Sequence, residues 1–493
     1  MSETVLNYIG GEWSRAQSGA TAERRNPACT DELVATFPRS GREDVEKAVR
    51  AAREAFEGWR RTPAPRRGDI LFRALRLFEL RKEEVARAMT REEGKTLRES
   101  RGEVQKSLNV LEFVAGEARR LNGETVPSEM PSTFCYTVRE PLGVVAVITP
   151  WNFPVAIPAW KIAPALVAGN TVVFKPASAT PVTARILVEV LVEAGVPRGV
   201  LNLVYGDGGS IGSMLVDHPD VRAVSFTGSN EVGSKLHADA AKTHKKVLCE
   251  MGGKNPLVVL EDADVELAAV AAAQGAFGST GQRCTATSRA IVARSRLEEF
   301  LRYVEREARA IVVGDGMKES TTMGPCVDER QHRTVLEYLA IARDEGARFV
   351  TGGDRLSASA LQMGYFVPPT ILADVKPSMR VAQEEIFGPV LSVIAVDSFE
   401  EAIEVSNDVR YGLAASIYTE DVERVMRFID RIEVGIVHIN SPTVGGEAQL
   451  PFGGMKATGV GGREMGRTAI EFFTEWKTVY VDYTGSKRET NIY

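Results

Sequence analysis

The chain has 493 residues, of which 44% are hydrophobic and 26% charged, with a formal net charge of −6. This length exceeds what one hydrophobic core supports, so we expect two or three domains of an ordinary globular protein. The negative charge argues against nucleic-acid binding as the main role, and we expect no nucleic-acid partner.

Cysteine and histidine usage indicates a reducing compartment and no metal site. The cysteines are odd in number and scattered, and the histidines are not at the spacing of metal ligands. No apolar run approaches bilayer thickness, and the N-terminus lacks the basic region and apolar core of a signal peptide. We therefore expect a cytoplasmic protein without a membrane partner.

The N-terminal quarter is predicted to be mainly helical. Residues 5–15 predict a short strand with a turn at Gly10-Gly11, and apolar residues recur at helical spacing from 42 to 121. Pro63 and Pro65 break that region into two helices.

Two strand-like stretches lie far apart in the sequence, at 125–139 and 473–482. They could pair and extend a sheet between subunits. An ordinary edge strand is the alternative.

From residue 142 onward, apolar strands alternate with helices in two series. The first predicts strands at 142–149, 170–175, 200–205, 221–227 and 245–250, with helices at 161–168, 183–194, 210–217 and 232–241. The second predicts strands at 256–260, 290–293, 365–372, 391–396 and 436–440, with helices at 265–277, 297–311, 332–345 and 399–405. Such alternation predicts two α/β lobes, each with a parallel sheet that binds ligands at the carboxyl ends of its strands.

Candidate functional side chains follow the strand ends of the first lobe. Asn152 lies in a proline-bracketed turn, where its amide could stabilise an oxyanion or merely hold the turn. Lys175 ends an apolar strand and suits a ribose hydroxyl or a phosphate, unless it is simply solvated. The turn at 226–233 offers a helix N-terminus to a phosphate, although an ordinary strand-to-helix turn fits its glycine spacing as well.

Two further residues are candidates for acid–base and nucleophilic chemistry. Glu250 follows an apolar strand and precedes two glycines, so partial burial could raise its pKa and make it a general base; a salt bridge is the alternative. Cys284 lies among small residues beside the cation Arg283, which could lower its thiol pKa and make it a nucleophile. A buried structural cysteine is the alternative.

Taken together and in this order, five segments resemble the aldehyde dehydrogenase superfamily through essentially the whole chain. They are Pro150-Trp-Asn-Phe-Pro154, Glu250-Met-Gly-Gly-Lys254, Gly281-Gln-Arg-Cys284, Glu385-Ile-Phe-Gly-Pro389 and Pro451-Phe-Gly-Gly454. The resemblance implies an α/β fold of two doubly wound parallel-sheet lobes, a Rossmann-like cofactor domain and a catalytic domain, plus a small β oligomerisation arm. We expect the dinucleotide-binding domain at 1–121 and 143–252, the catalytic domain at 253–452, and the arm at 122–142 and 468–493.

The resemblance also implies an NAD(P)-dependent oxidation of an aldehyde to the carboxylic acid through a cysteine thiohemiacetal and thioester. Cys284 would attack the aldehyde, Asn152 would hold the oxyanion, and Glu250 would activate water, with Lys175 completing the catalytic set. The implied cofactor contacts are Trp151, Lys175, Ser178, Gly228, Ser229, Gly233, Glu385 and Phe387. The implied substrate pocket comprises Phe153, Ile157, Trp160, Arg283, Thr285 and Phe452.

The sequence also supports more specific expectations about the preferred cofactor and the substrate. Many NAD-preferring members carry glutamate where this chain has Ser178, so we expect NADP to be preferred and NAD to be accepted. The sequence is most similar to bacterial dehydrogenases of α-ketoglutaric semialdehyde (2,5-dioxopentanoate), and Arg283 could hold the anionic tail of such a substrate. The alternatives are a broad-specificity aliphatic aldehyde dehydrogenase and a non-phosphorylating glyceraldehyde-3-phosphate dehydrogenase. The resemblance favours a homodimer or homotetramer.

Overall fold

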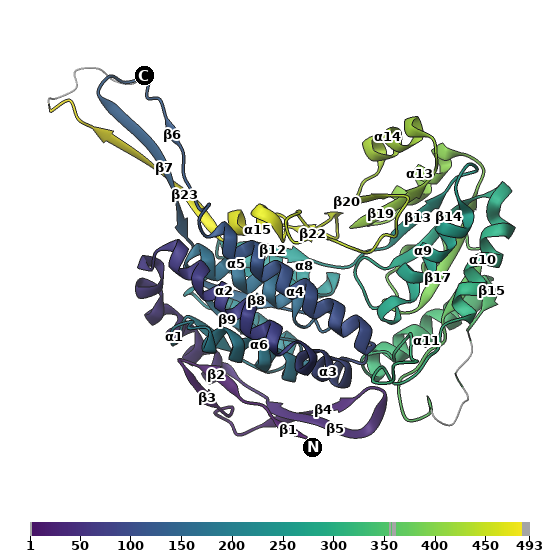
Figure 1. Cartoon of the computed structure of the whole chain (residues 1–493), viewed down its shortest axis with the longest axis horizontal. Helices are drawn as coiled ribbons and strands as arrows, with labels where there is room; N and C mark the ends of the chain where they lie inside the picture. The colour runs from purple at the N-terminus through teal and green to yellow at the C-terminus, as the bar shows by residue number, and fades with distance from the viewer. Residues whose placement is uncertain (1, 354–355, 357–360, 486–493) are drawn as a thin grey trace.

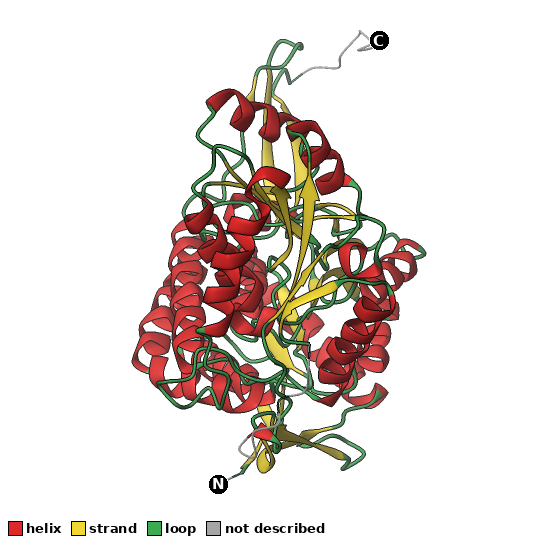
Figure 2. Ribbon diagram, turned by 90° about the vertical axis from the view of Figure 1, so that its right-hand side faces the viewer, coloured by secondary structure: helices red, strands yellow, loops and turns green. Residues whose placement is uncertain are grey.

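The computed structural model describes residues 2–353, 356 and 361–485. Two lobes lie side by side, and a narrow arm projects from one of them (Figure 1). Helices flank the strands on both sides (Figure 2), which confirms the predicted α/β class. In the described part of the chain, no helix is long and apolar enough to cross a lipid bilayer.

The first lobe is built on an eight-stranded sheet in the order β22-β12-β11-β8-β9-β10-β2-β3. Its strands are β2 (Asn7–Ile9), β3 (Glu12–Ser14), β8 (Val144–Ile148), β9 (Thr171–Lys175), β10 (Leu201–Leu203), β11 (Val221–Thr227), β12 (Lys246–Glu250) and β22 (Gly459–Val460). The five central strands are parallel. They are apolar because helices cover both faces of the sheet.

The helices of this lobe are more numerous at the N-terminus than predicted. They are α1 (Arg42–Arg61), α2 (Ala64–Leu80), α3 (Lys82–Glu93), α4 (Leu97–Glu117), α5 (Ala156–Ala168), α6 (Pro181–Glu193), α7 (Gly208–Asp217) and α8 (Asn230–Ala241). Gly94 ends α3 with a left-handed φ of 103°, and Thr96 starts α4 by accepting a hydrogen bond from the Glu99 N–H. The predicted break at Pro63 and Pro65 is confirmed, since α1 ends at Arg61 and α2 begins at Ala64. The region divides again at Arg81 and at the two signals Gly94 and Thr96, which the prediction did not include.

The second lobe contains a seven-stranded sheet in the order β15-β16-β17-β14-β13-β19-β20, parallel except for β15. Its strands are β13 (Asn255–Val259), β14 (Thr287–Ala293), β15 (Arg348–Thr351), β16 (Thr370–Ala373), β17 (Val390–Val396), β19 (Ala414–Tyr418) and β20 (Ile436–Ile439). Its helices are α9 (Val265–Phe277), α10 (Leu297–Arg309), α11 (Glu329–Asp344), α12 (Arg380–Gln383), α13 (Phe399–Asn407) and α14 (Val422–Arg431). The strand expected at 365–372 is shorter because Pro368 and Pro369 cannot donate to a ladder.

A small three-stranded sheet at the N-terminal end was absent from the sequence prediction. It consists of β1 (Glu3–Thr4), β4 (Thr21–Asn26) and β5 (Cys29–Pro38). The register of β4 against β5 shifts twice, at Arg24/Arg25 and at Arg25/Asn26, and such bulges interrupt the alternation by which a strand is recognised.

The arm joins two segments that are far apart in the sequence. Strand β7 (Thr133–Pro141) pairs antiparallel with β23 (Thr474–Asp482), and β6 (Thr125–Val126) adds a short third strand. The predicted pairing of the two stretches is therefore confirmed. The short pair β18 (Tyr411–Gly412) and β21 (Met455–Lys456) and the helix α15 (Gly466–Phe472) complete the elements. The domain boundaries drawn from the sequence remain a prediction, and residues 486–493 of the predicted arm lie outside the described residues.

Candidate active site

The first-lobe residues predicted to act in catalysis converge where its strand order reverses. Strand β8 lies between β9 and β11, so the loops that follow β8 and β11 leave the sheet beside each other. Asn152 lies in the first loop, Gly228 in the second, and Glu250 ends the neighbouring β12. The Gly228 N–H donates to the main-chain oxygen of Glu250 over 3.1 Å, which ties the loop after β11 to the end of β12.

The Cys284 loop begins with strained backbone. Ser279 and Thr280 have φ values of 50° and 58°, a left-handed conformation that non-glycine residues rarely adopt. The Thr280 hydroxyl donates to the Gly324 oxygen over 3.0 Å, and the Gln282 side chain accepts from the Val327 N–H over 2.9 Å. These buried bonds hold the loop in its strained form.

Asn152, the predicted oxyanion donor, is in direct contact with the loop that carries Cys284, called the nucleophile loop below for the predicted role of that cysteine. The Asn152 side-chain amide donates to the main-chain oxygen of Gln282 over 3.0 Å, two residues before Cys284. On the other side, the Asn255 amide donates to the Cys284 oxygen over 2.8 Å. A Cβ at Gly253 would lie only 2.7 Å from that oxygen, so only glycine fits there. The structure thus brings Asn152 and Cys284 together.

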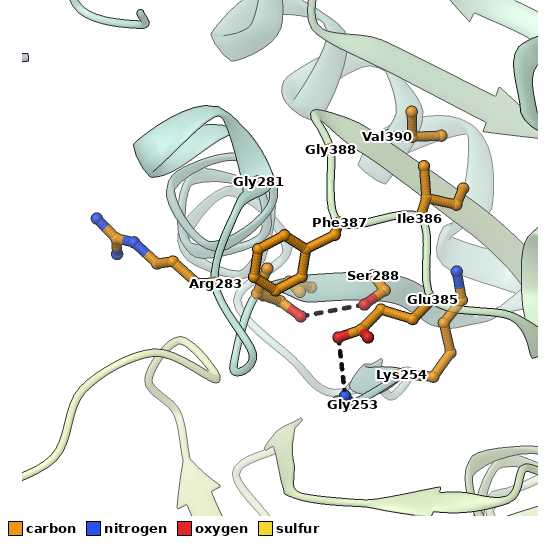
Figure 3. Close-up of a pocket in the computed structure, with 12 residues that line it drawn as sticks. Gly253, Lys254, Gly281, Arg283, Ser288, Glu385, Ile386, Phe387, Gly388 and Val390 are labelled. Atoms are coloured by element: carbon orange, nitrogen blue, oxygen red, sulfur yellow. Dashed lines mark hydrogen bonds between the residues drawn. The ribbon is translucent and has the colours of Figure 1, made fainter. Parts of the chain in front are cut away.

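The thiol of Cys284 is held in its neutral form. Burial raises its pKa to about 12, and the charges of Glu385 and Glu250 add to this effect. The expectation that Arg283 lowers this pKa was wrong. The Arg283 guanidinium donates to the Ser279 hydroxyl over 3.0 and 2.9 Å and lies 3.7 Å from Glu99. Figure 3 shows its side chain directed away from Glu385 and Phe387.

Glu250 is a buried carboxyl group suited to act as a general base. Burial and the neighbouring Glu464 raise its pKa well above the ordinary value, while Lys161 and Arg463 oppose that shift. A Cβ at Gly453 would lie 2.2 Å from the Glu250 carboxyl, so the glycine leaves room for that group. A carboxylate with a raised pKa can accept a proton near neutral pH.

The sequence prediction missed Glu464, which forms a second buried carboxyl beside Glu250. It accepts a hydrogen bond from Trp160 Nε1 over 2.7 Å and pairs with the ammonium of Lys161. Its main-chain N–H and oxygen both bond Phe452 over 2.7 Å. The charge of Glu464 raises the pKa of Glu250 and that of Lys161 lowers it, so this ion pair acts on the candidate base through its charges. The only sequence signal was an acid following the glycines at 461–462.

Lys175 and Ser178 lie together at the end of β9. Burial lowers the pKa of the Lys175 ammonium to about 8, and Asp207 partly offsets that shift. Within the described residues the ammonium makes no hydrogen bond or ion pair, although its side chain is buried. The Ser178 hydroxyl donates to the Gly206 oxygen over 3.1 Å. A buried cation without a partner fits a bound polar group, such as a ribose or phosphate.

The turn at 228–233 starts α8 closely packed against the Glu250 strand. The Ser229 hydroxyl caps the helix by accepting from the Val232 N–H over 3.4 Å. A Cβ at Gly233 would lie 2.6 Å from the sulfur of Met251, so a larger residue would push the first turn away. The open N–H groups of such a turn can bind a diphosphate.

Glu385 and Phe387 line a pocket together (Figure 3), and Trp151 contacts Phe387. The Glu385 carboxylate accepts from the Gly253 N–H over 3.0 Å, and burial raises its pKa to about 7. The rings of Trp151 and Phe387 meet edge to face with centroids 5.4 Å apart. A Cβ at Gly252 would lie 2.0 Å from the Glu385 carboxylate, so only glycine at this position leaves room for that side chain. The carboxylate and the aromatic pair fit the ribose and ring of a nicotinamide nucleotide.

Of the six residues predicted to line the substrate pocket, Arg283 makes contacts that differ from those of the other five. Trp160 and Phe452 stack with ring centroids 5.5 Å apart, next to Glu464. Ile157 is buried, the Phe153 ring lies 4.6 Å from the Lys95 ammonium, and Thr285 accepts from Thr443 over 2.8 Å. Arg283 instead contacts Ser279 and the start of α4.

Comparison with known proteins identifies the class to which this site belongs. Residues 13–479 match the aldehyde dehydrogenase family, so the chain is a member of that family and an NAD(P)-dependent aldehyde dehydrogenase. A Bacillus subtilis relative named alpha-ketoglutaric semialdehyde dehydrogenase is 48% identical over 478 residues, 97% of this chain and 98% of the relative.

Two solved structures extend the likeness to the fold. Betaine aldehyde dehydrogenase of Staphylococcus aureus in complex with NAD⁺ is 36% identical, with a TM-score of 0.96 and coverage of 98% of this chain and 96% of that one. A structure described as an Escherichia coli NADP-dependent enzyme is 37% identical, with a TM-score of 0.94 and coverage of 97% and 98%.

Proposed function

We propose that this enzyme oxidises 2,5-dioxopentanoate, with Cys284 as nucleophile, Asn152 as oxyanion donor and Glu250 as general base. The observation that carries the chemistry is the contact of the Asn152 amide with the nucleophile loop, with the Glu250 carboxyl beside it. The name and similarity of the Bacillus subtilis relative support the substrate.

In this proposal, the Cys284 thiol gives up its proton to water as its sulfur adds to the aldehyde carbon, and the carbonyl oxygen becomes an oxyanion. The Asn152 amide and the Cys284 N–H donate to that oxygen. Bound NAD(P) supplies the chemistry of accepting hydride from the same carbon. Glu250 then takes a proton from the water that hydrolyses the Cys284 thioester.

The same proposal assigns the cofactor to the residues whose fit was described above. Lys175 and Ser178 would hold the adenosine ribose, and the turn Gly228, Ser229 and Gly233 would hold the diphosphate. Glu385 would bind the nicotinamide ribose, with Trp151 and Phe387 beside the ring. Lys175 binds here and does not touch the reacting atoms.

The substrate is tested by comparing kcat/KM for 2,5-dioxopentanoate, succinic semialdehyde, glyceraldehyde-3-phosphate and a neutral aliphatic aldehyde. We expect the semialdehydes with a carboxylate to be preferred. The Arg283 guanidinium has five donors, and two of them bond Ser279, so a substrate carboxylate can compete with Glu99 for the others. Arg283→Gln is therefore expected to lower kcat/KM about tenfold for anionic aldehydes, which corresponds to one charge-assisted hydrogen bond.

The matched control for this substitution is Arg294→Gln. Arg294 lies just beyond the far end of β14 and pairs with Asp397 at the surface. An equal loss on anionic and neutral aldehydes in Arg283→Gln would show that this arginine only supports the loop. Faster turnover of the neutral aldehyde by the unmodified enzyme would instead indicate a general aldehyde dehydrogenase.

For the cofactor, we propose that NADP is preferred over NAD. A serine at 178 places no carboxylate near a 2′-phosphate, and the Lys175 ammonium lies at the same strand end. Ser178→Glu is expected to lower kcat/KM for NADP about 10- to 100-fold, with little change for NAD, because like charges repel. The measurement is initial rate against each cofactor, with Ser178→Gln as the neutral control of similar size. A strong preference of the unmodified enzyme for NAD would contradict the proposal.

For assembly, we propose a homo-oligomer held by the arm. Phe134 and Val481 on one face of the arm, and Trp476 and Tyr480 on the other, are each at least 43% exposed, and such exposed apolar side chains suit contact with a second copy of the chain. Sedimentation that gives a monomer mass at micromolar concentration would refute this.

We also propose a cytoplasmic location, which the five free cysteines support and cell fractionation would test.

A further inference from the structure

A group of buried charges lies beneath the Asn152 turn and has no part in the proposed chemistry. Lys95 connects α3 to α4, and Glu103 lies on α4; both side chains are 1% exposed. The Lys95 ammonium donates to Glu103 Oε2 over 2.7 Å and to the main-chain oxygen of Asn152 over 2.6 Å. A buried lysine thus bonds directly to the residue that carries the oxyanion donor.

Glu103 binds the other end of the same turn through hydrogen bonds. Its Oε1 accepts from the N–H groups of Val155 and Ala156 over 2.9 and 3.1 Å, at the start of α5. Between these contacts, the Lys95 ammonium lies 4.6 Å from the centroid of the Phe153 ring. The residues from Asn152 to Ala156 are therefore fixed by one ion pair that binds both ends of the segment.

The electrostatic setting keeps the Lys95 ammonium charged. Burial alone would lower the pKa of Lys95, but Glu103 and Glu93 outweigh it and leave that pKa above the ordinary value. Ion pairs buried so completely add little to stability compared with apolar packing. They do fix geometry, because each charged group keeps its position only while all its hydrogen bonds are made.

Position matters here because Asn152 makes two opposed contacts. Its main-chain oxygen is held by Lys95, and its side-chain amide reaches across to the Gln282 oxygen on the nucleophile loop. A displacement of about 1 Å in such a donor can reduce a rate on the order of 100-fold. The Lys95 bond therefore sets how far the amide reaches toward Cys284.

We propose that Lys95, paired with Glu103, is a positioning residue that places the Asn152 amide at the oxyanion. This inference rests on the proposed roles of Asn152 and Cys284. It predicts that removing the Lys95 charge reduces the rate through Asn152 and through no other group.

The test compares Lys95→Met in two backgrounds, the unmodified enzyme and Asn152→Ala. In the first, kcat is expected to fall about 10- to 100-fold with KM for the aldehyde and for NAD(P) within about twofold. In the second, the same substitution should cost less than about threefold, because the donor it positions is already absent. Hydrolysis of p-nitrophenyl acetate, which needs the oxyanion donor but no cofactor, should follow the same pattern. Equal factors in both backgrounds would overturn the inference.

Controls separate this result from misfolding and from failure of the proposed function. Lys245→Met removes another lysine that donates to main-chain oxygens, those of Val216 and His218, and should leave kcat unchanged. If Lys95→Met does not fold, Lys95→Met/Glu103→Gln removes the unpaired charge and carries the same comparison. Full activity in Asn152→Ala would refute the proposed oxyanion role. A slow Asn152→Ala enzyme with equal Lys95 factors would refute only the positioning role.

Discussion

Replacing Cys284 with alanine is expected to reduce kcat by roughly 10⁴- to 10⁶-fold, as loss of a covalent nucleophile does elsewhere. No other cysteine can substitute for it, because the strained turn at Ser279 and Thr280 and the bond from Asn255 present this residue alone to the Asn152 amide. NAD(P)H formation measured by absorbance reports the loss. Cofactor affinity should stay within about twofold, since the thiol makes no part of the proposed cofactor cradle.

Cys135→Ala is the control for this substitution, because Cys135 is another free cysteine but is buried on the arm strand β7. It should retain full activity. Turnover of a tenth or more of the original rate by Cys284→Ala would assign the covalent step to another residue. The raised pKa of Cys284 adds a pH dependence: the thiolate population grows as pH rises, so kcat/KM should increase from neutral into alkaline solution.

Replacing Glu250 with glutamine is expected to lower steady-state kcat by about 10²- to 10⁴-fold, the usual contribution of a general base. The loss should fall on hydrolysis of the thioester. The first turnover therefore releases about one NAD(P)H per active site, and later turnovers are slow. A stopped-flow measurement of this burst separates the two half-reactions.

The dependence of the hydrolysis rate on pH provides a second test of Glu250. The pKa of Glu250 is raised, and the proton-accepting form is the carboxylate, so hydrolysis is lost as pH falls through that raised pKa. Glu250→Gln should lose this acid limb. Glu261→Gln, at an exposed carboxylate paired with Arg424, should keep both rate and profile. A Glu250→Gln enzyme without a burst, or with near-normal turnover, would place the base elsewhere.

Much of the fold and of the candidate site could be predicted from local sequence. Apolar runs such as 144–148 and 255–259 predict buried parallel strands, and glycines and prolines mark the loops at their ends. The family follows from five short motifs, and its match covers residues 13–479. These strands, loops and motifs are determined by residues that are neighbours in the sequence, and for that reason the sequence alone was enough to predict them.

The features that were missed depend on contacts between distant residues. Glu464 matters because Trp160 and Lys161, about 300 positions away in the chain, bond its carboxylate. Lys95 matters because it reaches the Asn152 oxygen, 57 positions away. The expected effect of Arg283 on Cys284 failed for a related reason. Adjacency along the chain does not give side-chain direction, and the turn at Ser279 draws the guanidinium away.

The return of the chain to its first lobe has a consequence for synthesis on the ribosome. The strands of the second sheet are complete once Ile439 has emerged from the ribosome. At that point the first lobe still lacks β22, α15 and the arm strand β23. Until then β12 is an open edge, with unpaired main-chain groups at Cys249 and Glu250. The lobe made second can thus finish its sheet first. A nascent chain released before Val460 would expose an unpaired strand edge beside the residue proposed as the catalytic base, so only chains that extend past Val460 escape this route to aggregation.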